Sequence, residues 1–380
     1  MGVTGIVEAM HSRIARVPPP LGTLADTPTT GITGLVYRSI RGTTGLVGKA
    51  LDTALAGVEA ALPTSLQALP EGQAAAAREA LVAALNGVMG DHLERSGNSL
   101  ATRMTLRPRP EGAVRGPRVL LLVHGLCMTD HQWTRDGHDH GQALAQSLGY
   151  CPVYARYNSG LHVSANGAEL AAQLESLLAQ WPVPVESLAV IGHSMGGLVV
   201  RSALQEALRA GMAWPDKLQH LVFLGTPHHG APLERGGNWL HRGLGVSPYA
   251  APFTRLSGLR SAGITDLRHG NLQTQDWAGN RFAQHDTRSA VPLPRGVACY
   301  AIAGTLGEGE GGSGEWVGDG LVPVASALGH HSKPTRDLHI PPSHQWIARG
   351  VNHLDLLGSE AVYRRLKRWL KAGPRGAISP

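Results

Sequence analysis

The spacing of apolar residues changes along the chain and divides it into two parts. Between residues 32 and 62 apolar residues recur mostly at steps of three and four, which predicts an amphipathic helical segment. An Ala-rich stretch from about Gln73 to Arg95 predicts a further helix, with Gly97 as a stop signal after it. We therefore expect residues 1–110 to form a helical N-terminal extension.

From residue 118 onward, short apolar runs alternate with helical stretches. The runs at 118–123, 153–157, 187–191, 218–224 and 297–303 predict buried strands, and residues 165–181, 196–210 and 358–371 are expected to be helices. Strands that alternate with helices in this way form a mostly parallel sheet with helices on both faces. Residues 111–375 are therefore predicted to form one domain of the α/β class.

The alternation breaks between Pro227 and Pro294, where Gly, Pro, His and Arg separate short apolar patches. A segment this long inside a regular α/β pattern is best interpreted as an insertion above the sheet, here residues 227–294. Its apolar residues, Trp239 among them, would form a lid or the wall of a binding site; ordinary packing of an inserted helix explains them equally well.

Composition and charge argue against several classes of protein. The chain has 380 residues, 42% of them apolar, a globular value that argues against disorder. The formal net charge is +6, but Lys and Arg are scattered and only three Phe occur, so we expect no nucleic-acid partner. Three cysteines give no disulfide framework, and neither a secretory signal nor a membrane-spanning run stands out, so a cytoplasmic location is expected.

The most informative motif is Gly192-His193-Ser194-Met195-Gly196, which follows the apolar run 187–191 and precedes a helical stretch. Strand, sharp turn and helix in this order are the context of a nucleophile elbow, which exposes a serine hydroxyl above the sheet. Side chains at positions 192 and 196 would collide with the neighbouring strand or helix, which explains both glycines. Ser194 is therefore the predicted nucleophile.

A serine hydroxyl needs an imidazole to remove its proton and an acid to orient that imidazole. Along such chains the order is serine, acid, histidine. Asp319 lies in a loop that follows the run 297–303, and His353 lies in the loop before the last helix, so both are assigned to the triad. The alternatives are His330, His331, His339 and His344 for the base, and Asp337 and Asp355 for the acid; Asp355 is expected to cap or brace the last helix.

Negative charge that develops on the substrate oxygen needs two N–H donors in fixed positions. The backbone N–H of Met195 follows from the elbow, at the start of a helix whose dipole also favours an anion. The second donor is expected from the loop after the run 118–123, where Leu126 is the candidate and His124 supports the loop.

Together the segments 123–126 (VHGL), 192–197 (GHSMGG) and 224–230 (LGTPHHG) resemble bacterial lipases and esterases of the α/β-hydrolase fold, including its inositol-deacylase-like branch, which acts on acyl esters of lipids. The segments 318–323 and 352–354 complete the pattern, and the resemblance covers about residues 115–372. It implies hydrolysis of carboxylic esters through an acyl-serine intermediate. It does not identify the acyl chain, so the substrate is a small-molecule or lipid ester.

Two further groups of polar residues are candidates for a metal site or for substrate binding. The His/Asp-rich patch 130–140 matches no zinc-ligand spacing, so we expect it to form hydrogen bonds within itself, and neither a metal nor another cofactor is expected. His124, His228, His229 and Trp239 are the candidate substrate-binding residues, although His228 and His229 are equally compatible with structural roles in a turn.

Further functions remain open. The same triad supports acyl transfer or thioester hydrolysis, and a lipid- or granule-binding protein could retain the fold without activity. The N-terminal segment is expected to pack on the α/β domain; contact with a lipid surface or with a second copy of the chain are the alternatives, and the oligomeric state is left open.

Overall fold

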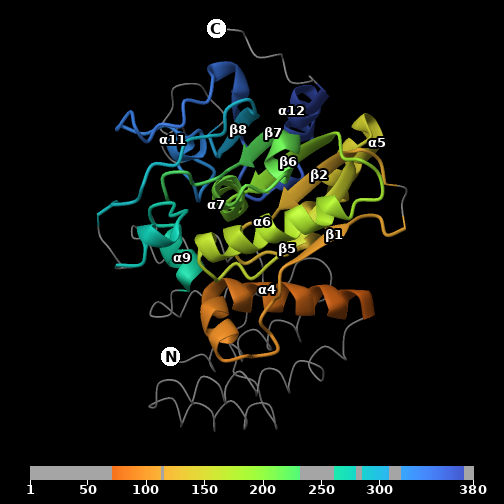
Figure 1. Cartoon of the computed structure of the whole chain (residues 1–380), viewed down its shortest axis with the longest axis horizontal. Coiled ribbons are helices and arrows are strands. Elements are labelled where there is room, and N and C mark those ends of the chain that lie inside the picture. The colour runs from red at the N-terminus through yellow and green to blue at the C-terminus, as the bar shows by residue number, and fades with distance from the viewer. Residues whose placement is uncertain (1–70, 113–114, 232–260, 280–284, 308–317, 372–380) are drawn as a thin grey trace.

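A seven-stranded sheet organises the chain. The computed structural model describes residues 71–112, 115–231, 261–279, 285–307 and 318–371. The sheet has the order β1-β5-β2-β6-β7-β8-β9 (Figure 1). Its strands are β1 (Thr105–Pro108), β2 (Arg118–Val123), β5 (Cys151–Arg156), β6 (Ser187–His193), β7 (Leu218–Leu224), β8 (Ala298–Thr305) and β9 (Gln345–Arg349). A second, two-stranded sheet pairs β3 (Thr134–Arg135) with β4 (His138–Asp139).

All strand pairs of the main sheet are parallel except one. The edge strand β1 runs antiparallel to β5, with Thr105 opposite Arg156, whereas β6 is parallel to both β2 and β7. The carboxyl ends of β2, β6, β7 and β8 therefore open on the same edge of the sheet. In an open parallel sheet this edge is where ligands bind.

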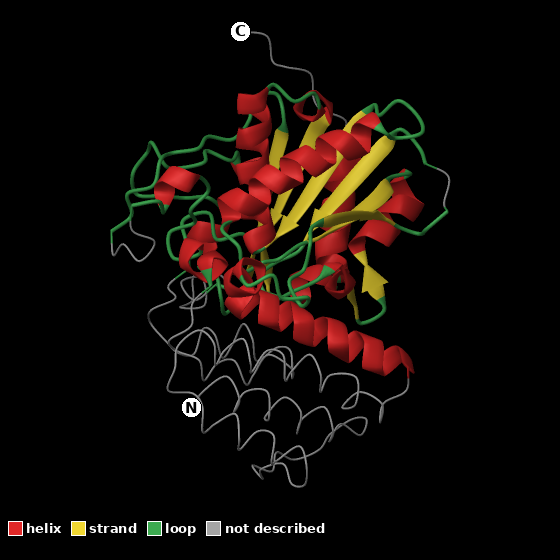
Figure 2. Cartoon of the chain, turned by 60° about the horizontal axis from the view of Figure 1, so that its bottom comes forward, coloured by secondary structure: helices red, strands yellow, loops and turns green. Residues whose placement is uncertain are grey.

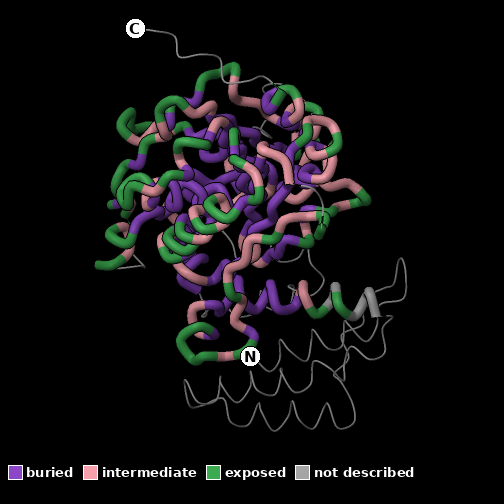
Figure 3. Tube along the Cα trace, turned by 45° about the vertical axis from the view of Figure 1, so that its right-hand side comes forward, coloured by how far each residue is buried: buried purple, intermediate pink, exposed green. Residues whose placement is uncertain are grey.

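Apolar residues on both faces of these strands explain why the sheet is covered on two sides. Residues such as Leu121 and Val190 pack against α6 (Val163–Ala179), α7 (Met195–Ala210) and α11 (Val324–Ala327). Residues such as Leu122 and Ile191 pack on the other face, against α5 (His140–Leu148) and α12 (Glu360–Lys371). Figure 3 shows buried residues gathered inside the α/β domain, and the burial of the strand residues accounts for them.

The sequence expectations for this domain are largely confirmed. The mostly parallel α/β sheet and each of the five expected strands and three expected helices are present, with bounds shifted by a few residues. Elements that were not expected include the edge strands β1 and β9, the short strands β3 and β4, and helices α5 and α11. Among the described residues, no helix combines the length and apolar character needed to cross a membrane.

The helix expected near residues 73–95 is confirmed as α4 (Glu71–Arg95), which bends at Met89. It lies along one side of the α/β domain (Figures 1 and 2). The helical segment expected at 32–62 lies outside the described residues. The domain boundary at residues 110 and 111 stays a prediction.

The insertion expected at 227–294 is described only in part. Its described residues include the short helix α9 (Ala262–Asp266), which contacts α4, and a 3-10 helix at Thr274–Asp276. Residues 232–260, with Trp239, lie outside the described part of the chain. The lid and the packed-helix interpretations of that segment therefore both stay open.

Candidate active site

Ser194 lies between the end of β6 and the start of α7, in a backbone conformation that side chains rarely adopt (φ 54°, ψ −127°). The chain can turn this sharply only because glycines lie two positions before and two positions after Ser194. A Cβ at Gly192 would lie 2.6 Å from Gly197 Cα of α7, and one at Gly196 would overlap the carbonyl oxygens at the end of β2. The collisions expected at both positions are therefore present, and the turn is held where the Ser194 N–H donates to the Leu224 carbonyl at 2.8 Å.

Asp319 and His353 form a buried pair. His353 Nδ1 donates to Asp319 Oδ2 at 2.7 Å, and the His353 N–H donates to the Asp319 carbonyl at 3.1 Å. The other carboxylate oxygen, Oδ1, accepts the N–H groups of Leu321 at 3.0 Å and Val322 at 2.8 Å. The carboxylate is thus held in one orientation, which fixes the proton of His353 on Nδ1 and leaves Nε2 as an acceptor.

Gly225 brings this pair to the nucleophile. It directly follows Leu224, the residue that accepts the Ser194 N–H, and has φ 55°. A Cβ at this position would lie 3.0 Å from Asp319 Oδ2 and 3.1 Å from His353 Cε1. Gly225 therefore joins the residue that accepts the Ser194 N–H to the Asp319–His353 pair, two parts of the chain that are far apart in sequence. Within the described residues the Ser194 hydroxyl makes no hydrogen bond, and in unliganded enzymes this contact often tightens only with substrate.

The loop after β2 lies directly against the elbow. A Cβ at Gly125 would lie 2.9 Å from Ser194 Cβ, so the next residue, Leu126, follows a backbone in contact with the nucleophile. Among the described residues, no acceptor takes the Leu126 N–H. The Met195 N–H belongs to the first turn of α7, where backbone donors have no partner within the helix. Two backbone donors without a protein acceptor among the described residues thus belong to segments that contact or follow Ser194.

His193 is a site residue that the sequence motif contains but whose role the sequence did not indicate. Its Nε2 donates to the His353 carbonyl at 3.0 Å, and the two ring centroids are 4.7 Å apart. Burial, and after it the neighbouring His353, hold the pKa of His193 well below its ordinary value. His193 therefore remains a neutral donor that fixes the backbone of His353. No local signal could have revealed this, because the partner lies 160 positions further along the chain.

His124 supports the loop after β2, as expected from the sequence. It is fully buried, its Nδ1 donates to the Gly125 carbonyl at 2.8 Å, and its ring stacks on Tyr157 with centroids 4.3 Å apart. The Tyr157 hydroxyl donates to the His124 carbonyl at 2.7 Å. Burial lowers the pKa of His124 to about 4, so this support is uncharged at neutral pH.

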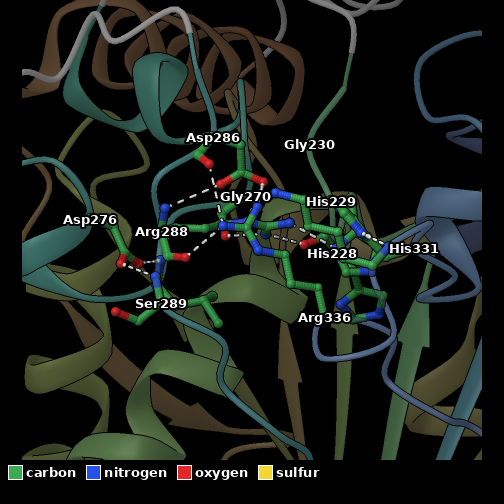
Figure 4. A network of polar contacts seen from close by, with 12 residues as sticks. His228, His229, Gly230, Gly270, Asp276, Asp286, Arg288, Ser289, His331 and Arg336 are labelled. Atoms are coloured by element: carbon green, nitrogen blue, oxygen red, sulfur yellow. Dashed lines mark hydrogen bonds and ion pairs between the residues drawn. The ribbon is translucent and has the colours of Figure 1, made fainter.

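His228 and His229 lie in the loop after β7, within a network centred on Arg288 (Figure 4). Arg288 donates to the His228 carbonyl at 2.6 Å, to the Gly270 carbonyl at 3.1 Å and to His229 Nδ1 at 2.8 Å. The His228 ring is fully buried and meets Phe223 edge-on. These contacts join the segment around Arg288 to the loop that begins at Gly225, through the His228 carbonyl and the His229 ring.

The His/Asp-rich patch hydrogen-bonds within itself, as expected, and also braces the loop after His353. His138 Nε2 donates to His140 Nδ1 at 2.8 Å, and His140 Nε2 donates to the Leu356 carbonyl at 2.9 Å. Arg135 in β3 donates to Asp355 at 2.7 Å. Asp355 is therefore a bracing residue at the 3-10 helix Asp355–Leu357. Within the described residues, no group of His, Cys, Asp and Glu side chains is arranged to hold a metal ion.

The remaining candidates for the acid and the base form hydrogen bonds away from the elbow. Asp337 accepts the N–H groups of His331 and His339, at 3.1 Å and 2.7 Å. His330 contacts Gln345, and His344 donates to the Cys299 carbonyl at 3.0 Å. Of the five histidines considered for the base, His353 is the one that the structure joins to Asp319.

Comparison with known proteins confirms the resemblance read from the motifs. Residues 115–279 match the family model of the PGAP1-like alpha/beta domain. This segment contains the elbow and the loop after β2, whereas Asp319 and His353 lie beyond it. No curated protein matches the sequence.

Several solved structures of lipases and esterases are similar to this chain. Mature lipase BlEst2 from Bacillus licheniformis is 18% identical with a TM-score of 0.45, over 70% of this chain and 97% of that one. Lipase B from Aspergillus fumigatus is 15% identical (TM-score 0.43; 73% of this chain, 58% of that one), and esterase Pf2001 from Pyrococcus furiosus is 16% identical (TM-score 0.39; 68% and 82%). Similarity this low carries neither an activity nor a substrate over to the chain.

Proposed function

We propose, from the premise that residues 115–279 match a PGAP1-like alpha/beta domain, that this chain is a serine hydrolase of carboxylic esters. The observation that carries the proposal is the buried His353–Asp319 pair at Gly225, the residue after the one that accepts the N–H of the elbow serine. A serine on a strained turn beside such a pair is the arrangement that activates a hydroxyl for attack on a carbonyl.

In the first half of the proposed reaction, Ser194 Oγ attacks the ester carbonyl while His353 Nε2 takes its proton. Asp319 keeps the Nδ1 proton in place and stabilises the imidazolium, because its Oδ2 lies 2.7 Å from Nδ1. The N–H groups of Leu126 and Met195 donate to the oxyanion. His353 then gives its proton to the departing alcohol, and the acyl group remains on Ser194.

In the second half, His353 removes a proton from a water molecule, which attacks the acyl-serine. The same two N–H groups stabilise the second oxyanion, and the proton on His353 returns to Ser194 as the acid leaves. These steps need no metal or cofactor. Resemblance to the inositol-deacylase-like branch supports a lipid ester as the natural substrate.

Replacing Ser194 by alanine tests the proposal. We expect hydrolysis of p-nitrophenyl butyrate to fall to the rate of the uncatalysed reaction, because the variant cannot form the acyl intermediate, while circular dichroism stays unchanged. Labelling of the wild type by a fluorophosphonate, absent in the variant, identifies the nucleophile. A folded wild-type protein that neither hydrolyses the ester nor reacts with the probe would refute the proposal and favour a binding protein.

A further inference from the structure

Helix α4 precedes the segment that matches the family model and lies along one side of the α/β domain (Figures 1 and 2). Its buried part contacts the loop after β2. Residues 81–90 of this helix are all buried. At Gly87 the helix backbone approaches Cys127, the residue after Leu126. A Cβ at position 87 would overlap Cys127 Sγ and would lie 2.9 Å from both the Cα and the backbone N of Cys127.

The turn that receives this contact has an unusual backbone. Cys127 has φ 58°, a left-handed conformation that costs a residue other than glycine about 1 kcal/mol or more. On one side the Cys127 N–H donates to Ser159 Oγ at 3.0 Å. On the other side its thiol lies 4.0 Å from the Ala84 carbonyl of α4, and burial raises the pKa of the thiol, so it remains a protonated donor. The turn is therefore held between α4 and the loop after β5.

The position of α4 against this turn is itself fixed. The helix bends at Met89 (φ −142°, ψ 23°), and two side chains from the α/β domain donate to carbonyls on either side of the bend. Ser261 Oγ donates to the Gly87 carbonyl at 2.6 Å, and Asn158 Nδ2 donates to the Gly90 carbonyl at 3.0 Å. The helix residue that touches the turn thus also accepts a hydrogen bond from the segment before α9.

We propose that α4 completes the oxyanion hole by holding the Leu126–Cys127 turn, with Gly87 as the positioning residue. The inference rests on the proposed function, because it assigns the Leu126 N–H to the oxyanion. Gly87 lets two backbones meet where any side chain would push the turn away. A displaced Cys127 backbone also moves the Leu126 Cα to which it is joined, and with it the Gly125–Leu126 peptide that carries the Leu126 N–H, so the contact is transmitted to the donor.

The test compares kinetics with the binding of a transition-state analogue in the full chain. For Gly87→Ala we expect kcat for p-nitrophenyl butyrate to fall about 10- to 100-fold, as expected for a displaced donor, with KM changed less than about twofold. The inhibition constant of an alkyl trifluoromethyl ketone, which forms a tetrahedral adduct with serine, should rise by the same factor. A change in stability alone would not move these two quantities together.

A second variant adds no atoms and has a matched control. Ser261→Ala removes the hydroxyl that holds Gly87, so kcat should fall several-fold and the ketone should bind correspondingly more weakly. Ser96→Ala also removes a hydroxyl that donates to an α4 carbonyl, that of His92 at 2.9 Å, but far from the turn, and should leave both constants unchanged. This pair tests the inference even where Gly87→Ala does not fold.

A double-mutant cycle then tests whether Gly87→Ala lowers kcat through its contact with Cys127. In a Cys127→Ala background the added methyl group at position 87 no longer meets Sγ, so Gly87→Ala should lower kcat by a smaller factor than in the wild type. The inference is overturned if Gly87→Ala folds and retains wild-type kcat, or if Ser261→Ala behaves like Ser96→Ala. It is also overturned if the effects of Gly87→Ala and Cys127→Ala on kcat are additive. Failure of the wild type to hydrolyse any ester would instead overturn the proposed function.

Discussion

Replacing Asp319 by asparagine is expected to reverse the tautomer of His353 while it leaves the fold intact. Carboxylate Oδ1 accepts two backbone N–H groups, those of Leu321 and Val322, and Oδ2 accepts from His353 Nδ1. An asparagine satisfies the two N–H groups only with its carbonyl oxygen at the Oδ1 position. Its NH2 group then faces His353, so Nδ1 must become the acceptor. Nε2 carries the proton and can no longer take one from Ser194.

We expect this change to lower kcat about 10⁴-fold, which corresponds to about 5 kcal/mol of transition-state stabilisation. The free energy of unfolding should change by only about 1 kcal/mol, because every donor at this site still faces an acceptor after the substitution. Steady-state hydrolysis of p-nitrophenyl butyrate and urea unfolding measure the two quantities separately. Loss of activity with retained stability would distinguish a reversed tautomer from a damaged fold.

Asp337→Asn is the matched control, because Asp337 also accepts two backbone N–H groups but contacts neither Ser194 nor His353. Its kcat should stay within about twofold of the wild type, as for surface substitutions in general. An Asp319→Asn variant that retains more than about a tenth of wild-type kcat would refute the reasoning, since no reversed tautomer supports that rate.

Three further predictions follow from buried groups. Burial lowers the pKa of His140 from 6.5 to about 4, so the unfolded chain binds more protons, and stability falls as the pH drops from about 6.5 to 4. His140→Gln should therefore flatten the slope of unfolding free energy against pH, and an unchanged slope would contradict this. Arg288→Met should lower the unfolding free energy by about 3 kcal/mol, because buried carbonyl acceptors lose their donor. Arg364 forms an exposed pair with Glu360, so Arg364→Met should cost less than about 0.5 kcal/mol. Similar losses for both variants would disprove the role of Arg288. Gly225→Ala should reduce kcat about 100-fold by displacing Asp319 and His353, whereas Gly211→Ala, with φ 65° and no atom within 4 Å, carries only the backbone strain and should retain kcat.

The sequence predicted the elements whose structure is determined by residues close to them in the chain. Strands β2, β6 and β7 are buried on both faces, so each contains a run of consecutive apolar residues, and each was expected from that run. The elbow was predictable because crowding demands glycine at 192 and 196, which leaves a recognisable motif. Asp319 and His353 were assigned from chain order, and the hydrogen bond between them is a finding of the structure.

The features that the sequence did not predict depend on distant partners. Strands β1 and β9 lie at the two edges of the sheet and are only partly buried, so their sequences mix polar and apolar residues without a clear period. Helix α5 begins in the His/Asp-rich patch, where Asp139 is its N-cap and the polar residues concealed the helical spacing. The contacts of His193 and Arg288 join segments that only the fold brings together.

The brace between α5 and the end of the chain has a consequence for synthesis on the ribosome. His140 and Arg135 hold the segment after His353, and Tyr363 of α12 donates to the Ala143 carbonyl of α5 at 3.3 Å. The nascent chain can assemble β2, β5, β6 and β7 early, because these strands are translated first and pair with one another. The residues that receive the brace, Asp355 and Leu356, are translated only after all of these strands. A chain truncated by a premature stop directly after His353 would therefore retain the elbow and lack the brace that keeps its base in place.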